Sequence, residues 1–436
     1  MDSGRECGTG LASRSGLPYI PESVVVELLI RLPMKCVFRC KCVCKQWRSL
    51  IDAPSFGHAF VSRIASPFTA AQPKLWTLLY KCIHGEEIRH EHGFFRNLFS
   101  NDVGVACLTK SDLPPSAQTH GTDVYGILDH IIAMDGNGLL LCGSNSGWDF
   151  GRYYILNPIT KQYVEIPPSK RPFAHCCVGF ISQVKHSVVT SYKVIRLEDG
   201  GGRTSILKLD IFSSETGEWR DIEIPFQQVL QLFPLWKMPV VLKEILHFMD
   251  RKLGILAYDP YKGPHSYRII QLPGDIDREW SKSVDTKGIL FDVHHGHLRF
   301  FVGSNAYNDG YRVSMWTLSD YEEGLWLLEH RVNLREAACD SSYLRSSRLV
   351  PIAFHPFDSD TVYLGYEGSF LSYDYQSQQL LELDDNVTLP TDNATLRKEI
   401  QWCFVYRFML PLWPVSIQAS TIKVQENEVP KASCCL

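Results

Sequence analysis

The amino-acid sequence predicts a multi-domain protein in which a small all-α domain is followed by a large all-β domain. Three observations predict this fold class. Apolar residues recur at helical spacing before about residue 63. From about residue 68, short runs rich in aromatic and β-branched residues alternate with turn residues, which is a strand pattern. A weak repeat with steps of 46–60 residues runs through this second part, and such periods are typical of radial β architectures.

Composition narrows the classes of partner. The 436 residues are 45% hydrophobic and 21% charged, as in an ordinary globular protein. A formal net charge of −4 lacks the overall basic footprint of nucleic-acid binders. The longest apolar tract, residues 404–417, is interrupted by Arg407, Pro411 and Pro414 and is too short to span a bilayer. We therefore expect no nucleic-acid partner and no membrane partner.

The two ends of the chain are expected to be disordered or flexible, at residues 1–16 and 421–436. Residues 1–16 are rich in Ser, Gly and Arg and lack the apolar core of a secretory signal. We therefore expect a reducing compartment, the cytoplasm and/or the nucleus. The 14 cysteines are then thiols, and close neighbours such as Cys40, Cys42 and Cys44 are poor disulfide partners.

The first predicted helix begins at Pro21 and Glu22. Proline is tolerated in the first turn of a helix, and an acidic residue suits the positive end of the helix dipole. Pro33 ends the helix, because proline has no N–H to continue it. Between these prolines an apolar stripe recurs at i, i+3, i+4 and i+7, formed by Val25, Leu28, Leu29 and Leu32.

Two more short helices complete the predicted helical domain, residues 17–63. One fits Lys35 to Cys42, and the other begins at about Cys44 and is ended by Pro54. Three short helices of this size cannot bury much core. Apolar side chains on them, such as Trp47, need a cover. We expect a partner protein to supply it, and packing onto the C-terminal domain is the alternative.

The charge pattern of the helical domain favours an outside partner. The segment from Arg31 to Arg48 contains six basic residues and no acidic one. On the third helix Lys41, Lys45 and Arg48 lie roughly opposite a stripe that contains Val43 and Trp47. A basic rim around an apolar patch suits an acidic protein surface. Nucleic acid is an alternative partner, but no recognition motif supports it. The simplest interpretation is that these basic side chains are only solvated.

These residues resemble a known family, the F-box. The likeness lies in Ile20-Pro21, a second Leu32-Pro33 after one helix, and the run Val43-Cys-Lys-x-Trp-Arg-x-Leu50. Ile20 replaces the usual leucine, and Cys40 stands where an aromatic residue is common. In that family the motif binds the Skp-type adaptor of SCF (Skp–cullin–F-box) ubiquitin ligases. The resemblance implies adaptor contacts at Ile20, Pro21, Leu28, Leu29, Leu32, Pro33, Val37, Val43, Cys44, Lys45 and Trp47.

The repeat of the second part predicts a β-propeller over residues 64–420. Each unit has a strand, an Asp/Asn/Ser-rich turn and a closing strand, and the turns begin near residues 157, 213, 259, 319 and 374. Radial repetition protects the strand edges of an all-β chain, so we predict six or seven blades. The aromatic segment Trp402 to Trp413 is a candidate closing strand. An irregular sandwich is the alternative.

This second part is similar to the F-box-associated domains of plant F-box proteins. The similarity rests on four stretches: Asn157-Pro-x-Thr, Ser213-Ser-Glu-Thr-Gly-Glu-Trp219, Trp316-Thr-Leu-Ser-Asp-Tyr321 and His355-Pro-Phe-Asp358. In that family the region captures the protein that is to be ubiquitinated.

No catalytic, cofactor or metal site is predicted. The cysteines between Cys36 and Cys44 lack the second pair of ligands that a zinc site needs. His294-His-Gly-His297 has no nearby carboxylate set. The segment His84 to His92 lacks the metalloprotease arrangement of two histidines four residues apart, and Asp199-Gly-Gly-Gly202 lacks the Lys-Ser/Thr of a phosphate loop.

The predicted function is therefore that of a non-catalytic substrate receptor of an SCF ubiquitin ligase. Its expected partners are the Skp-type adaptor, cullin through that adaptor, and an unknown protein target. The competing prediction is a carbohydrate-binding or enzymatic β-propeller whose helical cap plays no part in ubiquitination.

Overall fold

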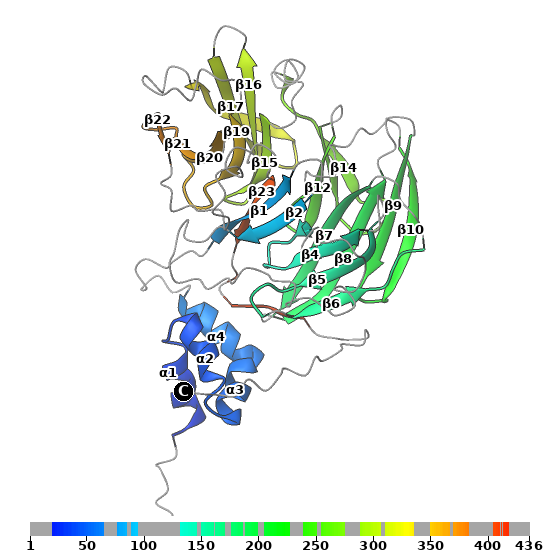
Figure 1. The fold of residues 1–436 in the computed structure, drawn as a ribbon. Coiled ribbons are helices and arrows are strands. Elements are labelled where there is room, and N and C mark those ends of the chain that lie inside the picture. The colour runs from blue at the N-terminus through cyan, green and yellow to red at the C-terminus, as the bar shows by residue number, and fades with distance from the viewer. Residues whose placement is uncertain are drawn as a thin grey trace, which may run out of the picture. The chain divides into compact units, whose positions relative to one another are not determined.

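The structure is a computed structural model that describes residues 20–64, most of residues 131–382, and shorter segments at 76–84, 89–94, 404–409 and parts of 411–417. The chain divides into two compact units, Met1–Gln72 and Pro73–Leu436. We call them the helical unit and the β unit, and Figure 1 shows the elements of each.

The helical unit contains four helices, α1 (Glu22–Leu29), α2 (Met34–Cys40), α3 (Lys45–Asp52) and α4 (Pro54–Ile64). The first three lie where helical spacing predicts them. The expectation of three helices is wrong, because Pro54 ends α3 and also begins α4. A proline at the first helical position loses no intrahelical hydrogen bond and has a suitable φ.

The interior of the helical unit is built around α3, which contacts each of the other helices. Val25 and Leu29 of α1 are buried, as is Ile51 of α3. From α4, Phe56 and Phe60 are buried, and their rings stack with centroids 6.4 Å apart. Residues four apart share one face of a helix, so this face of α4 is its packed side.

The β unit is built from antiparallel sheets of consecutive strands. Four sheets contain four strands each. Their strands are β3 (Ile131–Met134), β4 (Leu140–Asn145), β5 (Phe150–Leu156) and β6 (Tyr163–Ile166); β11 (Val240–Leu242), β12 (Ile245–Asp250), β13 (Gly254–Tyr258) and β14 (Tyr267–Ile270); β15 (Ile289–His294), β16 (His297–Ala306), β17 (Gly310–Asp320) and β18 (Leu325–Asn333); and β19 (Val350–Phe354), β20 (Thr361–Tyr366), β21 (Ser369–Asp374) and β22 (Gln379–Glu382).

Two further sheets recruit strands from the C-terminal part of the chain. One contains β7 (Cys176–Lys185), β8 (Val188–Glu198), β9 (Ile206–Ser213) and β10 (Glu218–Pro225), and β24 (Ser416–Ile417) joins it in parallel with β8. The other has the order β2-β1-β23, formed by β1 (Trp76–His84), β2 (Arg89–Phe94) and β23 (Phe404–Met409).

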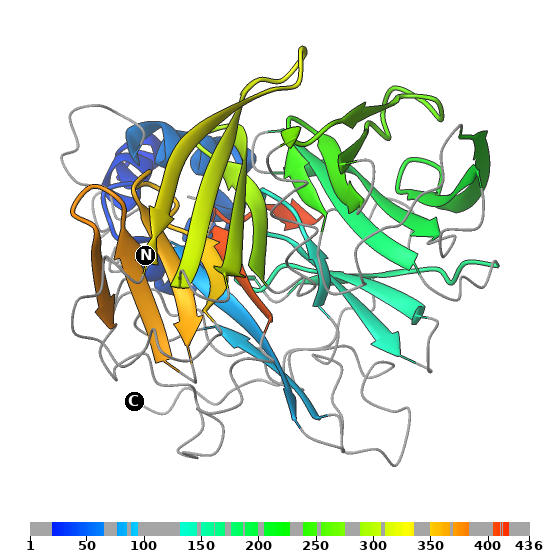
Figure 2. The same cartoon turned by 90° about the horizontal axis from the view of Figure 1, so that it is seen from above.

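The pairing of β23 with β1 joins the two ends of the β unit. The register runs from Trp76 opposite Met409 to Lys81 opposite Phe404, so the predicted closing strand is confirmed. Figure 2 shows the sheets following one another in chain order around a common centre, as in a propeller and unlike a sandwich. The described strands form six sheets, and the blade count stays a prediction.

The sequence repeat corresponds to a turn that recurs between the third and fourth strands of successive sheets. The side-chain Oδ1 of Asn157, Asp259, Asp320 and Asp374 accepts a hydrogen bond from a backbone N–H two or three residues later, at 2.6–3.2 Å. Such side chains stabilise turns by mimicking a backbone acceptor. In the β9–β10 turn, the carbonyl of Ser213 accepts from the N–H of Gly217 at 2.8 Å.

Two tryptophans of the repeat connect neighbouring sheets in the same way. The indole Nε1 of Trp219 in β10 donates to the carbonyl of Pro167 at 2.6 Å. The indole Nε1 of Trp326 in β18 donates to the carbonyl of Gln271 at 2.9 Å. Each acceptor directly follows the fourth strand of the preceding sheet. These equivalent contacts explain why the closing strands and the tryptophans recur together in the sequence.

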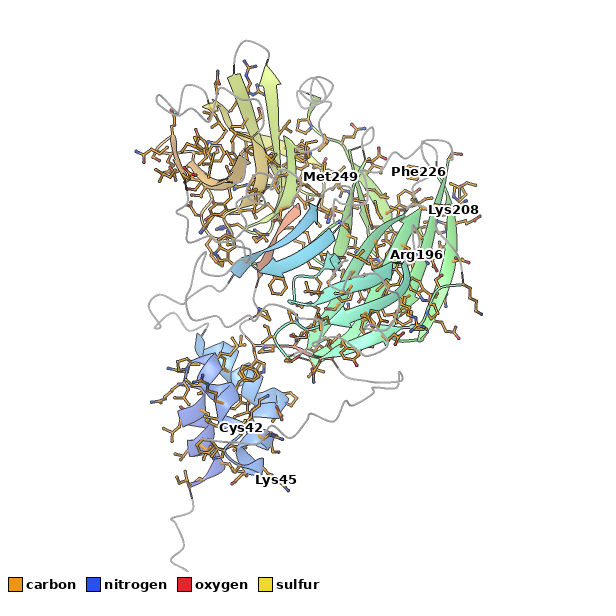
Figure 3. All side chains as sticks on the ribbon, in the orientation of Figure 1. Cys42, Lys45, Arg196, Lys208, Phe226 and Met249 are labelled. Carbon is orange, nitrogen blue, oxygen red and sulfur yellow. The ribbon has the colours of Figure 1, made fainter. Side chains whose placement is uncertain are left out.

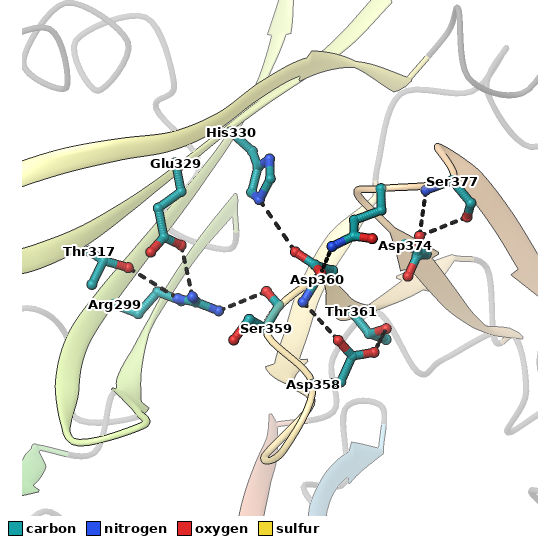
Figure 4. Close-up of polar contacts among 11 residues, drawn as sticks. Arg299, Thr317, Glu329, His330, Asp358, Ser359, Asp360, Thr361, Asp374 and Ser377 are labelled. Atoms are coloured by element: carbon teal, nitrogen blue, oxygen red, sulfur yellow. Dashed lines mark hydrogen bonds and ion pairs between the residues drawn. The ribbon is translucent and has the colours of Figure 1, made fainter.

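The faces between sheets hold the core. Leu209 and Leu256 belong to one apolar cluster and Val313 and Leu371 to another, and each pair comes from adjacent sheets. At Arg299 a buried polar contact joins the sheet of β15–β18 to the sheet of β19–β22. Its guanidinium donates to Glu329 at 2.8 Å, to Thr317 at 3.2 Å, and across the sheet boundary to the carbonyl of Ser359 at 3.0 Å (Figure 4).

Candidate protein-docking surface

Helix α1 is apolar on two faces, and only one of them is buried. Val25 and Leu29 are buried, whereas Val24 and Leu28 are exposed. A helix that is apolar on all sides is normally enclosed on all sides. The second face of α1 therefore has the composition of an interface.

Other exposed apolar residues of the helical unit lie close to α1 in sequence or on the segment before α3. Ile20 precedes the helix, Leu32 follows it, and Val43 lies before α3. The side chains with 37–63% of their surface exposed are Ile20, Val24, Leu28, Leu32 and Val43. We call these five residues the docking surface.

The predicted adaptor contacts divide into two groups in the structure. Leu29 and Val37 are buried, so the free chain does not expose them for direct contact, and Trp47 is half-buried. The exposed group contains Ile20, Pro21, Leu28, Leu32, Pro33, Val43, Cys44 and Lys45. Figure 3 labels Lys45 on the helical unit, together with its neighbour Cys42, which is also exposed.

Val24 is the exposed apolar residue that the sequence analysis missed. It lies four residues after Ile20 and four before Leu28, a spacing that places Val24 and Leu28 on one side of a helix. The signal was therefore present. Periodicity alone does not single out Val24, because the stripe through Val25 and Leu29 is sufficient to predict a helix.

Cys44 has a local structural role. It is the N-cap residue of α3, and its Sγ accepts a hydrogen bond from the backbone N–H of Trp47 at 3.4 Å. A cap of this kind satisfies one of the free N–H groups at the start of a helix. Cys44 thus helps to fix the turn of α3 from which Trp47 projects.

Part of the predicted basic rim is neutralised within the helical unit. The placement of Lys41 on the third helix is wrong, because Lys41 is the C-cap residue of α2. Lys41 pairs with Asp52 at 2.6 Å, and Arg31 pairs with Glu27 at 3.2 Å. Arg48 donates to the backbone carbonyl of Lys41 at 3.3 Å. Residues 20–64 nevertheless contain seven basic and three acidic residues, so an acidic partner surface remains favoured.

The histidines and cysteines considered as metal ligands in the sequence do not form a metal site in the described part of the chain. No group of three or more His, Cys, Asp or Glu side chains there could hold a metal ion. His294 contacts the carbonyl of His355 at 2.9 Å, and His297 contacts that of Leu318 at 3.2 Å. Burial, followed by the charge of Arg299, lowers the pKa of His294 to about 4.

Within the segment from His84 to His92, the residues that the structure describes fall on a strand pair. His84 ends β1, and residues 89–94 form β2, so no helix presents these histidines. Asp199-Gly-Gly-Gly202 lies outside the described residues. Among the helices described, none has the length and apolar character needed to cross a membrane.

Comparison with known proteins identifies both units. Residues 17–59 match the F-box domain family, and residues 105–408 match the family described as F-box protein At3g26010-like, beta-propeller. The Arabidopsis thaliana protein At1g15680, named as an F-box/kelch-repeat protein, is 26% identical over 421 residues, covering 92% of this chain and 89% of its own. F-box protein At3g26010 from the same plant is 25% identical over 365 residues, covering 81% and 76%.

The match to the β-propeller family, residues 105–408, spans well over half of the chain. All five residues of the docking surface lie within the match to the F-box domain family, residues 17–59. The chain therefore belongs to the family of F-box proteins with an At3g26010-like β-propeller.

Proposed function

We propose that this protein is the substrate receptor of an SCF ubiquitin ligase. The observation that carries the proposal is the docking surface, five exposed apolar side chains within the segment that matches the F-box. F-box domains bind Skp1-type adaptors, and the adaptor would connect this chain to cullin. The β unit would hold a target protein, in the cytoplasm and/or the nucleus.

The mechanism is proximity and involves no bond chemistry by this chain. A receptor that binds the adaptor through one unit and the target through the other holds a target lysine near the ubiquitin-conjugating enzyme. An encounter between two molecules then becomes an effectively intramolecular one, at a high effective concentration. The two units divide the task, which matches the division of the chain into two compact parts.

The adaptor contact is tested with leucines that are exposed in the free chain. Replacing Leu28 and Leu32 by alanine should weaken binding of a purified Skp1-type adaptor by about 2–4 kcal/mol, because both are anchors that become buried on binding. Titration calorimetry with the full chain measures the change. The control is Leu327→Ala in the β unit, a leucine that is 56% exposed, close to the 58% of Leu28, and this variant should bind like the wild type.

Wild-type affinity in the double variant would contradict the adaptor assignment. The target function needs a second experiment, affinity capture from plant cells with the proteasome blocked. The full chain is compared with a chain that lacks residues 1–63. Adaptor and cullin should be captured only by the full chain, and target candidates by both. If ligase components were retained by the shortened chain, the proposed division between the units would be wrong.

A further inference from the structure

The carbonyl of Ile30, at the end of helix α1, accepts a hydrogen bond from helix α4. The last carbonyls of any helix lack intrahelical partners. At Ile30, the C-cap residue of α1, the residue three positions later is Pro33, which has no N–H to donate. Instead, Nη1 of Arg63 donates to the Ile30 carbonyl at 2.5 Å, in a partly buried contact. A cation at this position also favours the negative end of the helix dipole.

Arg63 is itself held in place by the packing of its helix. It lies in the last turn of α4, three residues after Phe60 and seven after Phe56. Residues at this spacing share one face of a helix, and both phenylalanines are buried. The guanidinium therefore projects from the packed side of α4, and the contact with Ile30 needs little further ordering of the helix.

The start of α1 has a weaker attachment. Nε2 of Gln46 on α3 donates to Oε1 of Glu22 at 3.2 Å, between two exposed side chains. The exposed residues Val24 and Leu28 lie between the two attachments, and Leu32 follows Ile30 by two residues. A partly buried hydrogen bond from a charged group contributes more than an exposed one. The Arg63 contact is therefore the stronger of the two constraints on α1.

We propose that Arg63 is a positioning residue for the docking surface: it fixes the end of α1 so that Leu28 and Leu32 are presented together. The proposal rests on the proposed adaptor binding of the helical unit. The F-box match ends at residue 59, so Arg63 lies beyond the motif, and a fragment cut at the motif boundary would lack this contact.

The test uses the full chain with Arg63→Met, Arg63→Lys and, as the matched control, Gln46→Ala. Two quantities are measured: the affinity for a purified Skp1-type adaptor, and amide hydrogen exchange at residues 30–32 without adaptor. Arg63→Met should weaken adaptor binding about tenfold, the equivalent of one charged hydrogen bond, and speed exchange at these amides. Arg63→Lys should fall between Met and wild type, and Gln46→Ala should change both quantities less.

A purely structural role would give a different result. Arg63→Met would then lower the melting temperature while affinity and local exchange stayed at wild-type values, and the proposal would be overturned. Arg63→Lys keeps a cation and decides the question if the Met variant does not fold. If the wild-type chain does not bind the adaptor, the proposed function fails, whereas unchanged exchange at residues 30–32 in the Arg63 variants separately refutes the positioning role.

Discussion

The helical unit and the β unit differ in how much of their apolar surface they bury. In the helical unit, 45 described residues leave five large apolar side chains exposed. In the described part of the β unit, several times longer, the exposed ones are Ile206, Leu325, Leu327 and Leu381. Sheets packed face to face can cover one another's apolar residues, whereas short helices cannot cover all of theirs. The excess on the helical unit is therefore what a partner protein can bury.

The largest expected difference between the units is in stability. Phe300→Ala removes a fully buried ring from the β unit and should lower the free energy of unfolding by about 3–5 kcal/mol. Val24→Ala on the docking surface should change it by less than about 0.5 kcal/mol. Urea denaturation followed for each unit checks both values. A large loss of stability in the Val24 variant would mean that its side chain is already covered in the free chain.

The second expected difference concerns pH and is centred on His247 of the β unit. Its Nε2 lies 2.9 Å from the hydroxyl of Tyr321, in the turn between β17 and β18 of the neighbouring sheet, and its Nδ1 lies 3.2 Å from the carbonyl of Val240. Burial is the largest cause that lowers the pKa of His247 to about 4, well below the ordinary value of about 6.5.

A buried histidine with a lowered pKa stabilises the fold above the unfolded-state pKa, and this contribution is lost as pH falls from about 6.5 to 4. The shift corresponds to about 3 kcal/mol. His247→Gln should lose less stability than the wild type between pH 7 and 4. Asp135 changes the stability in the opposite direction as pH falls, since burial raises its pKa to about 6. The wild type and the His247 variant are therefore compared with each other at each pH. Parallel stability curves would contradict the role of His247.

The smallest expected effect tests the repeat within the β unit. Trp219→Phe and Trp326→Phe each remove one indole hydrogen bond to the preceding sheet, and each should cost about 1 kcal/mol. Because the contacts are equivalent, the two losses should be similar and additive. Neither variant should change adaptor affinity. Markedly unequal losses in denaturation experiments would show that the repeat in sequence does not reflect a repeat in energy.

Much of the fold could be predicted from the sequence because local signals and packing agree. Helical spacing predicts α1, α2 and α3, and the recurring Asn and Asp turns mark the connection between the third and fourth strands of successive sheets. The fourth helix was missed because a proline can end one helix and begin the next, and Pro54 does both. The closing pair of β1 and β23 spans more than 300 residues, and only the aromatic character of residues 402–413 hinted at it.

The docking surface was predictable in kind and not in detail. Val24, Val25, Leu28 and Leu29 are all apolar, so periodicity alone cannot say which pair is buried. The structure decides it through the position of α3, which contacts α1. The role inferred for Arg63 left no sequence signal, because its acceptor is a backbone carbonyl 33 residues away.

We propose that the exposed apolar face of α1 binds another protein, and the function proposed for the chain depends on this contact. Hydrogen–deuterium exchange and surface footprinting of the full chain, with and without a Skp1-type adaptor, test it most directly. We expect adaptor-dependent protection at residues 20–32 and around Val43, with the strands of the β unit unchanged. Protection confined to the β unit, or none at Val24 and Leu28 when adaptor is bound, would contradict it.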